Sequence, residues 1–216
     1  MILSISYHKR SEEYAQAQID HIKRLCGKIK YPILFIVGEG AKIDYKGVSD
    51  CITEKHVDFS NVRYPFICNQ VFSTAAEHAY HNKLNFLWLE TDCLVLRPDF
   101  IQLIETELLM SGKRAVLTAC SNPPHDIISG VGAYRHDVYE KCRSAMNPEF
   151  GGWDGALVRE FPNDIRYSSL IYHKYGDYDA DGKAHPFKFD SNQLVGAAIA
   201  HKMWSLEEYD NKDLYG

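Results

Sequence analysis

Short apolar runs alternate along this 216-residue chain with longer amphipathic segments, and this alternation limits the possible fold more than any other feature. Apolar runs of five to seven residues are typical of strands that are buried on both faces. They occupy residues 1–7, 31–37, 85–89 and 115–120. The intervening segments with helical spacing are 11–27, 67–82, 98–110 and 136–146. The alternation predicts an α/β fold, with a mainly parallel central sheet flanked by helices.

Local signals mark the ends of several of these elements. Ser11 is a candidate N-cap for the first helix, and Gly27 a candidate stop. Pro98 occupies the position expected in the first turn of a helix. Weaker patterns predict a short strand near residues 50–54, a loop at 121–126 and a strand at 130–135.

The length and composition exclude several classes of protein. We expect one domain over residues 1–216, because the chain has no repeat and no linker-like tract. No apolar run approaches 18 residues and the N-terminus lacks the features of a signal peptide, so a soluble protein is expected. The formal net charge of -5 disfavours a broad nucleic-acid surface.

The six cysteines lie at least 17 residues apart and form no Cys-x-x-Cys pair. This spacing does not indicate a zinc ribbon or a thioredoxin-type redox site. Their even number leaves disulfides open as an alternative. Several of them stand in apolar contexts, so we favour free, mostly buried thiols and a cytoplasmic location, which means the host cytoplasm if the protein is viral.

Two acids stand directly after the third apolar run, in Glu90-Thr91-Asp92. Strand residues alternate in direction, so Glu90 and Asp92 are expected to project to the same side. Ligands of open α/β sheets bind beyond the carboxyl ends of the strands. Two carboxylates there would repel each other unless a cation lay between them, and oxygen ligands suit Mg²⁺ or Mn²⁺. The alternative is a strand end whose acids simply face water.

The segment FLWLETDCLVLRPDF (86–100) resembles the metal-binding segment of the GT-A glycosyltransferases, in which an apolar strand ends in Asp-x-Asp. The resemblance extends to YPFICNQVFSTAAEHA (64–79), SGVGAYR (129–135) and GGWDGALVREF (151–161). Within this family, the sequence is particularly similar to the small transferases of bacteriophages and large DNA viruses. The departure is Glu90, which stands where the family has its first Asp.

The resemblance implies a single GT-A, Rossmann-like domain. Its nucleotide-binding half would span about residues 1–92, and its acceptor half with a C-terminal loop about 93–216. It also implies transfer of a sugar from a nucleoside-diphosphate sugar, with UDP favoured, to a hydroxyl acceptor. Mn²⁺ or Mg²⁺ is the implied cofactor, with Asp92 as the direct ligand. Glu90 would contact the metal, its waters or the ribose.

The resemblance also assigns residues near the C-terminus. His173, in His-Lys-Tyr-Gly, would complete the metal site, with His185 as a weaker substitute. Lys174 or Lys183 would pair with the diphosphate. Each could equally be an ordinary residue of a polar loop.

Four further residues each have one functional and one structural interpretation. Asp154 is a candidate catalytic carboxylate on the acceptor side, or the N-cap of the helix that follows. Trp153 would stack on a sugar face or belong to the core. Tyr7 would stack on the base or be a half-buried strand residue. Asn69 would reach the base or ribose, or be an exposed helix residue. A last pair, Ser129-Gly130, would present its backbone to the donor or form a turn.

Two other functions stay open. A sugar-phosphate nucleotidyltransferase would share the fold, but such enzymes usually carry a Gly-rich loop after the first strand, where this chain reads Tyr-His-Lys-Arg-Ser. A non-catalytic nucleotide- or carbohydrate-binding domain is the second. For a transferase, the viral resemblance suggests two acceptors, a glycan on a surface or capsid protein and a hydroxymethylated base in DNA. The acidic balance disfavours the nucleic acid.

Overall fold

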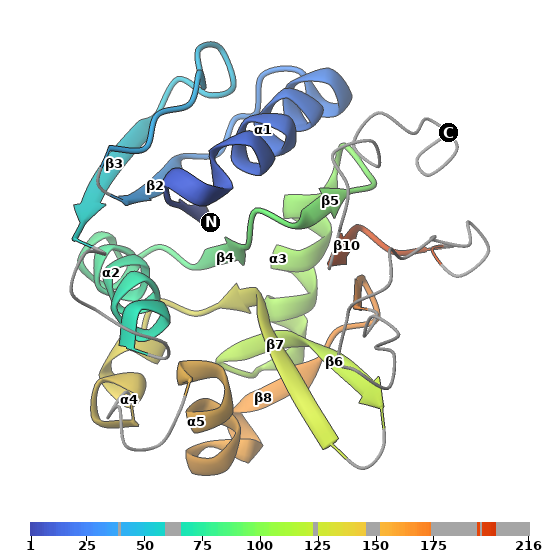
Figure 1. Ribbon diagram of the computed structural model, residues 1–216. Coiled ribbons are helices and arrows are strands. Elements are labelled where there is room, and N and C mark those ends of the chain that lie inside the picture. The colour runs from blue at the N-terminus through green and yellow to red at the C-terminus, as the bar shows by residue number, and fades with distance from the viewer. Residues whose placement is uncertain are drawn as a thin grey trace, which may run out of the picture.

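The computed structural model describes residues 1–38, 40–58, 66–122, 125–145, 152–173, 194 and 196–201, without the side chains of 118–122, 125–129, 142, 144, 145 and 154. These residues form a seven-stranded sheet (Figure 1). From one edge to the other, its strands are β3 (Ile52–Val57), β2 (Ile33–Gly38), β1 (Ile2–Tyr7), β4 (Phe86–Leu89), β7 (His125–Tyr134), β6 (Ala115–Asn122) and β8 (Ile165–Tyr167).

Four of the six neighbouring strand pairs are parallel, and only β7 runs antiparallel to both of its neighbours. The predicted α/β fold with a mainly parallel sheet is confirmed. A second, three-stranded sheet has the order β5 (Cys93–Val95), β10 (Ile199–His201) and β9 (Ile171–His173). It lies beside the carboxyl end of β4, because only three residues separate β4 from β5.

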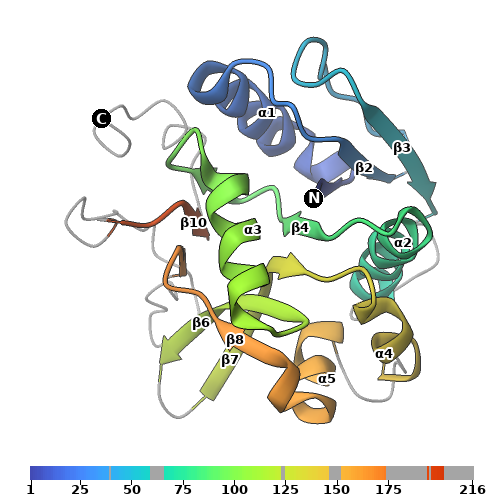
Figure 2. The same ribbon diagram turned by 180° about the vertical axis from the view of Figure 1, so that it is seen from behind.

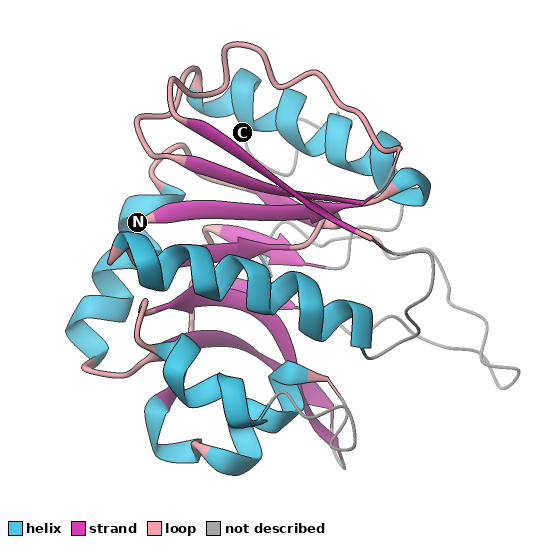
Figure 3. Ribbon diagram, turned by 90° about the vertical axis from the view of Figure 1, so that its left-hand side faces the viewer, coloured by secondary structure: helices cyan, strands magenta, loops and turns pink. Residues whose placement is uncertain are grey.

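Helices cover both faces of the large sheet (Figures 2 and 3). On one face, α1 (Glu12–Cys26) and α3 (Phe100–Ser111) pack against every second residue of β1, namely Leu3, Ile5 and Tyr7. On the other face lie α2 (Phe66–Asn82), α4 (Val138–Ala145) and α5 (Trp153–Glu160). Strands enclosed on both faces explain why the apolar runs in the sequence show no polar alternation.

The helix boundaries differ in part from the expectation. Gly27 ends α1 as predicted, with a φ of 66° that favours glycine, and its N–H donates to Lys23 O at 2.9 Å. Ser11 precedes α1, but its side chain does not cap it. It instead accepts from His8 N–H at 3.1 Å, closing the short 3₁₀ turn η1 (Lys9–Ser11). Pro98 lies outside the first turn of α3, because Asp99 is the N-cap.

The hairpin of β6 and β7 corrects two further expectations. The strands reach Asn122 and begin again at His125, so four of the six residues predicted as a loop belong to strands. Ser129 and Gly130 lie inside β7 and do not form a turn. A register shift opposite Leu117 and Thr118 marks a bulge at this point.

The cysteines with described side chains, Cys26, Cys51, Cys68 and Cys93, form no disulfide. Only Cys93 is fully buried and Cys51 is exposed, so the expectation of mostly buried thiols holds in part. None of the helices in the described part of the chain combines the length and apolarity that crossing a membrane requires.

Candidate active site

The small sheet brings three side chains from distant segments into register. His201 on β10 lies opposite Cys93 on β5 and opposite His173 on β9. The two histidine rings are 4.6 Å apart between centroids, and their Nδ1 atoms are 2.7 Å apart. Only 1% of His201 is exposed. The pairing of strands far apart in the sequence thus places a buried imidazole beside the acidic segment.

The two acids converge on that imidazole. The Nε2 of His201 lies 3.0 Å from Glu90 Oε2 and 3.2 Å from Asp92 Oδ1. Since both neighbours are carboxylates, this nitrogen carries the hydrogen and donates. As expected, the two acids project to the same side. The cause is a turn after the strand, and not the alternation of strand residues. β4 ends at Leu89, and Cys93 N–H donates to Glu90 O at 3.2 Å to close the turn.

Two opposing effects act on the pKa of His201. Burial disfavours the charged imidazolium and lowers the pKa, whereas the charge and hydrogen bond of Asp92, with those of Glu90, raise it. The carboxylates prevail, so the pKa of His201 is raised. The site therefore attracts a positive charge to the point between the two acids.

The donor set suits a divalent cation. One ligand atom each from Asp92, Cys93 and His201 lies within 4.8 Å of the others. Carboxylate oxygen and imidazole nitrogen are ligands that Mn²⁺ accepts. Glu90 approaches His201 at Nε2, where Asp92 also lies, whereas His173 approaches the other ring nitrogen, Nδ1.

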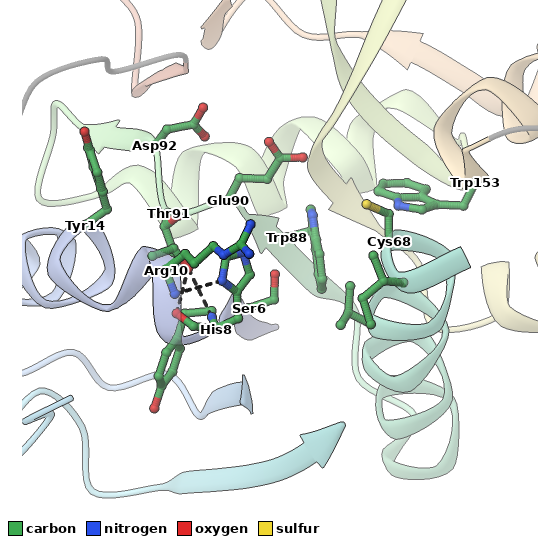
Figure 4. A pocket seen from close by; sticks show the side chains of 14 residues that line it. Ser6, His8, Arg10, Tyr14, Cys68, Trp88, Glu90, Thr91, Asp92 and Trp153 are labelled. Atoms are coloured by element: carbon green, nitrogen blue, oxygen red, sulfur yellow. Dashed lines mark hydrogen bonds between the residues drawn. The ribbon is translucent and has the colours of Figure 1, made fainter. Parts of the chain in front are cut away.

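A cavity of about 540 Å³ opens directly onto these acids. Figure 4 shows Glu90 between Arg10 and His8 on one side and Trp88, Cys68 and Trp153 on the other, with Asp92 nearer to Tyr14. Its volume falls within the range of about 300–1,000 Å³ that is usual for small-molecule sites. Arg10 is the one lysine or arginine among the described residues that line it.

Tyr7 and Trp153 line this cavity, yet both are core residues. Tyr7 packs edge-on against Phe35, and burial raises the pKa of its phenol. Trp153 is 5% exposed and stacks parallel on Phe72, with ring centroids 3.6 Å apart. One face of the indole is therefore covered by protein, which favours the core interpretation of Trp153.

Asn69 is buried, with 6% exposure, and is not the exposed helix residue offered as its alternative. Its Oδ1 accepts from the backbone N–H of Trp153 at 2.7 Å. Gly152 is the N-cap of α5 and makes no side-chain cap, so Asn69 supplies one from another helix.

Asp154 is the second residue of α5, which excludes it as the N-cap, but its side chain lies outside the description. Lys174, Lys183 and His185 lie outside the described residues.

His201 was missed by the sequence analysis. It follows the apolar run Ala197–Ala200, so the available signal was a histidine closing a strand-like segment. The partner strand, β5, lies more than 100 residues earlier, and nothing in the sequence links the two.

A seven-stranded, mainly parallel sheet with helices on both faces is the fold of the GT-A glycosyltransferases. Comparison of sequences finds no matching family profile and no matching curated protein.

Solved structures do match. The galactosyltransferase LgtC, in complex with donor and acceptor sugar analogs, has a TM-score of 0.61 at 10% identity over 99% of this chain and 95% of that one. A glycosyltransferase involved in the glycosylation of the major capsid of PBCV-1 has a TM-score of 0.57 at 13% identity, over 98% and 97%. GlyE from Streptococcus pneumoniae TIGR4 has a TM-score of 0.59 at 10% identity, over 100% and 60%. At such identities the likeness establishes the fold.

Proposed function

We propose that the chain is a metal-dependent glycosyltransferase that moves a sugar from a nucleoside-diphosphate sugar to a hydroxyl acceptor. One observation carries the proposal: Glu90, Asp92 and His201 converge at the carboxyl edge of the sheet, on the border of a cavity of about 540 Å³. Ligands of open α/β sheets bind at this edge. The resemblance of residues 86–100 to the GT-A metal segment supports the same conclusion, and a UDP-sugar is the first donor to test.

Asp92 and the Nε2 of His201 would hold the divalent ion, with Glu90 beside them and His173 at the other ring nitrogen of His201. When bound, Mn²⁺ or Mg²⁺ supplies positive charge to the diphosphate as it becomes the leaving group. His201 must lose the Nε2 hydrogen that now faces the acids before that atom can act as a ligand. The two carboxylates keep the local field suited to a cation in either state.

Other residues of the cavity could bind the nucleotide-sugar donor. Arg10 offers a guanidinium on the cavity wall, where it can pair with a phosphate oxygen. Burial and the nearby Arg10 lower the pKa of His8, so its imidazole stays neutral near pH 7. Its Nδ1 accepts from Arg10 N–H at 3.1 Å, which leaves the hydrogen on Nε2 as a donor. Lys174 and Lys183 remain candidates for the diphosphate.

Asp154 is proposed as the carboxylate on the acceptor side. It follows Trp153, which lines the cavity, in the first turn of α5. A carboxylate in this turn is favoured by the helix dipole. It would accept the proton of an acceptor hydroxyl, or orient that hydroxyl.

For the acceptor itself, we propose a glycan or a protein-linked sugar. The fold neighbour involved in capsid glycosylation and the net charge of -5 both favour this class over DNA. A hydroxymethylated base is the second candidate.

Calorimetry of UDP binding with Mn²⁺ and with EDTA tests the proposal, together with release of UDP from a panel of UDP-sugars. We expect Mn²⁺ to tighten UDP binding, and Asp92→Ala or His201→Ala to abolish this gain. Asp99→Asn is the matched control, because Asp99 is paired with Arg97 and borders a different cavity.

The outcomes separate the alternatives. Equal UDP affinity with Mn²⁺ and with EDTA contradicts the metal-dependent site. Metal-dependent binding without turnover of any sugar nucleotide identifies a binding domain, and formation of pyrophosphate from a nucleoside triphosphate identifies a nucleotidyltransferase.

A further inference from the structure

Gln18, on α1, makes two hydrogen bonds to the backbone of the acidic turn. Its Nε2 donates to Glu90 O at 2.8 Å and to Cys93 O at 2.9 Å. These two carbonyls are the first and last of the turn that holds Glu90, Thr91 and Asp92. A single side chain from a different element therefore spans the turn that carries both acids.

The orientation of this amide is fixed by its surroundings. Both neighbours are carbonyl oxygens, so the NH₂ group must face them, because the amide oxygen could not donate. Gln18 is 0% exposed, and its Oε1 is buried without a hydrogen-bond partner among the described residues. An unsatisfied buried oxygen is unfavourable, so the glutamine is not a choice that packing alone explains.

The position of Gln18 on the helix supports the same conclusion. The buried face of α1 carries Ala15, Ile19 and Ile22, and Gln18 falls on this stripe. An apolar residue here would extend the core, as its neighbours do. Glu90 O already accepts from Cys93 N–H at 3.2 Å, so Gln18 adds a second bond to a turn that is already closed.

We infer that Gln18 is a positioning residue of the active site, which fixes the Glu90–Cys93 turn and thereby sets the placement of Asp92 against His201. Residues that orient metal ligands from outside the coordination shell commonly contribute tenfold or more to metal affinity. Gln18 would do so through the backbone of the turn, without touching metal or substrate. The inference rests on the proposed function for its effect on metal, but the hold on the turn is measurable by itself.

The test compares Gln18→Met, which keeps the volume and removes both donors, with His21→Leu. His21 is equally buried on α1, and its Nε2 lies 2.6 Å from Val95 O, at the far end of β5. Gln18→Met loses two hydrogen bonds and His21→Leu loses one, in each case between α1 and the backbone of the turn or of β5, so both should lower the melting temperature. Gln18→Asn, which keeps the amide but is one methylene shorter, serves as the second variant if Gln18→Met does not fold.

Two readouts are taken at a temperature well below unfolding. Mn²⁺ affinity, measured by electron paramagnetic resonance, should weaken at least tenfold in Gln18→Met and stay within twofold of wild type in His21→Leu. Hydrogen exchange of the amides of residues 91–93 should quicken in Gln18→Met alone.

Each outcome decides something. Wild-type affinity and wild-type exchange in Gln18→Met, or equal loss of Mn²⁺ affinity in both variants, overturn the positioning role and leave the proposed function standing. A wild-type protein that binds no Mn²⁺ overturns the proposed function. In that case the exchange rates still decide whether Gln18 holds the turn.

Discussion

Replacing Asn69 by alanine distinguishes the two roles that the sequence and the geometry give this residue. From the sequence, Asn69 either reaches the base or ribose of a nucleotide or is an exposed helix residue. In the structure, its Oδ1 accepts from the N–H of Trp153, the first residue of α5, at 2.7 Å. Both partners are buried. We therefore expect Asn69→Ala to destabilise the fold and to leave nucleotide affinity within about twofold of wild type.

The magnitude follows from the bond that is lost. Removing an N-cap costs about 0.5–2 kcal/mol, and leaving a buried donor unsatisfied costs about 1–3 kcal/mol. These ranges describe the same interaction, so we expect a loss of about 1–2 kcal/mol in the free energy of unfolding. For a chain of this size, each kcal/mol lost from the free energy of unfolding lowers the melting temperature by about 2–4 °C. The melting temperature should therefore fall by about 2–8 °C.

Thermal and urea unfolding measure this loss, and calorimetry with UDP measures the affinity. Asn69→Asp should recover most of the stability, because a carboxylate oxygen also accepts and is favoured at a helix N-terminus. Asn82→Ala is the control on the same helix, since the Nδ2 of Asn82 bonds only exposed groups of the helix end. Unchanged unfolding together with a tenfold loss of UDP affinity would refute the structural role and restore the nucleotide contact.

Two further predictions concern the neighbourhood of α5. Gly130→Ala should lower the free energy of unfolding by about 1–3 kcal/mol in urea titrations, because its Cβ would lie 2.2 Å from a ring carbon of Trp153, a buried side chain that is stacked on Phe72. Wild-type stability would contradict this packing. Asp154→Asn should lower turnover by about 10²–10⁴-fold, with UDP affinity kept and stability changed by less than about 1 kcal/mol. Near-normal turnover would remove Asp154 from the catalytic candidates.

The parts of the fold that the sequence predicts well are those that depend on local pattern. Buried parallel strands produce unbroken apolar runs, so β1, β2 and β4 were found within about two residues. The β6–β7 hairpin was underestimated, because its strands extend beyond the apolar stretch into polar residues such as Ser121 and Asn122. Pairing with β7 extends β6 into these polar residues, because strand formation depends on the neighbouring strand as well as on intrinsic propensity.

In the candidate site too, residues with a local sequence signal could be predicted, and those brought in by nonlocal pairing could not. Glu90 and Asp92 were found because a strand and its polar end are adjacent in sequence. His201 joins them through β10, whose pairing with β5 is nonlocal and leaves no periodic signal. Gln18 did leave one, as a polar residue on the apolar stripe of α1. That signal indicates a buried hydrogen bond but does not name its partner.

Burying these polar and charged side chains is unfavourable for stability, which argues that they serve a function. His201 is almost wholly buried and its Nε2 faces two carboxylates, on a strand whose other residues, Ile199 and Ala200, are apolar. Replacing a buried ionic group by apolar side chains of similar volume is often neutral or stabilising, so stability does not explain it. Sites that break the pattern of a core are commonly those that carry function. His201 and Gln18 both contact the Glu90–Cys93 turn, so a binding event at this turn would use two of the buried polar side chains of the described residues.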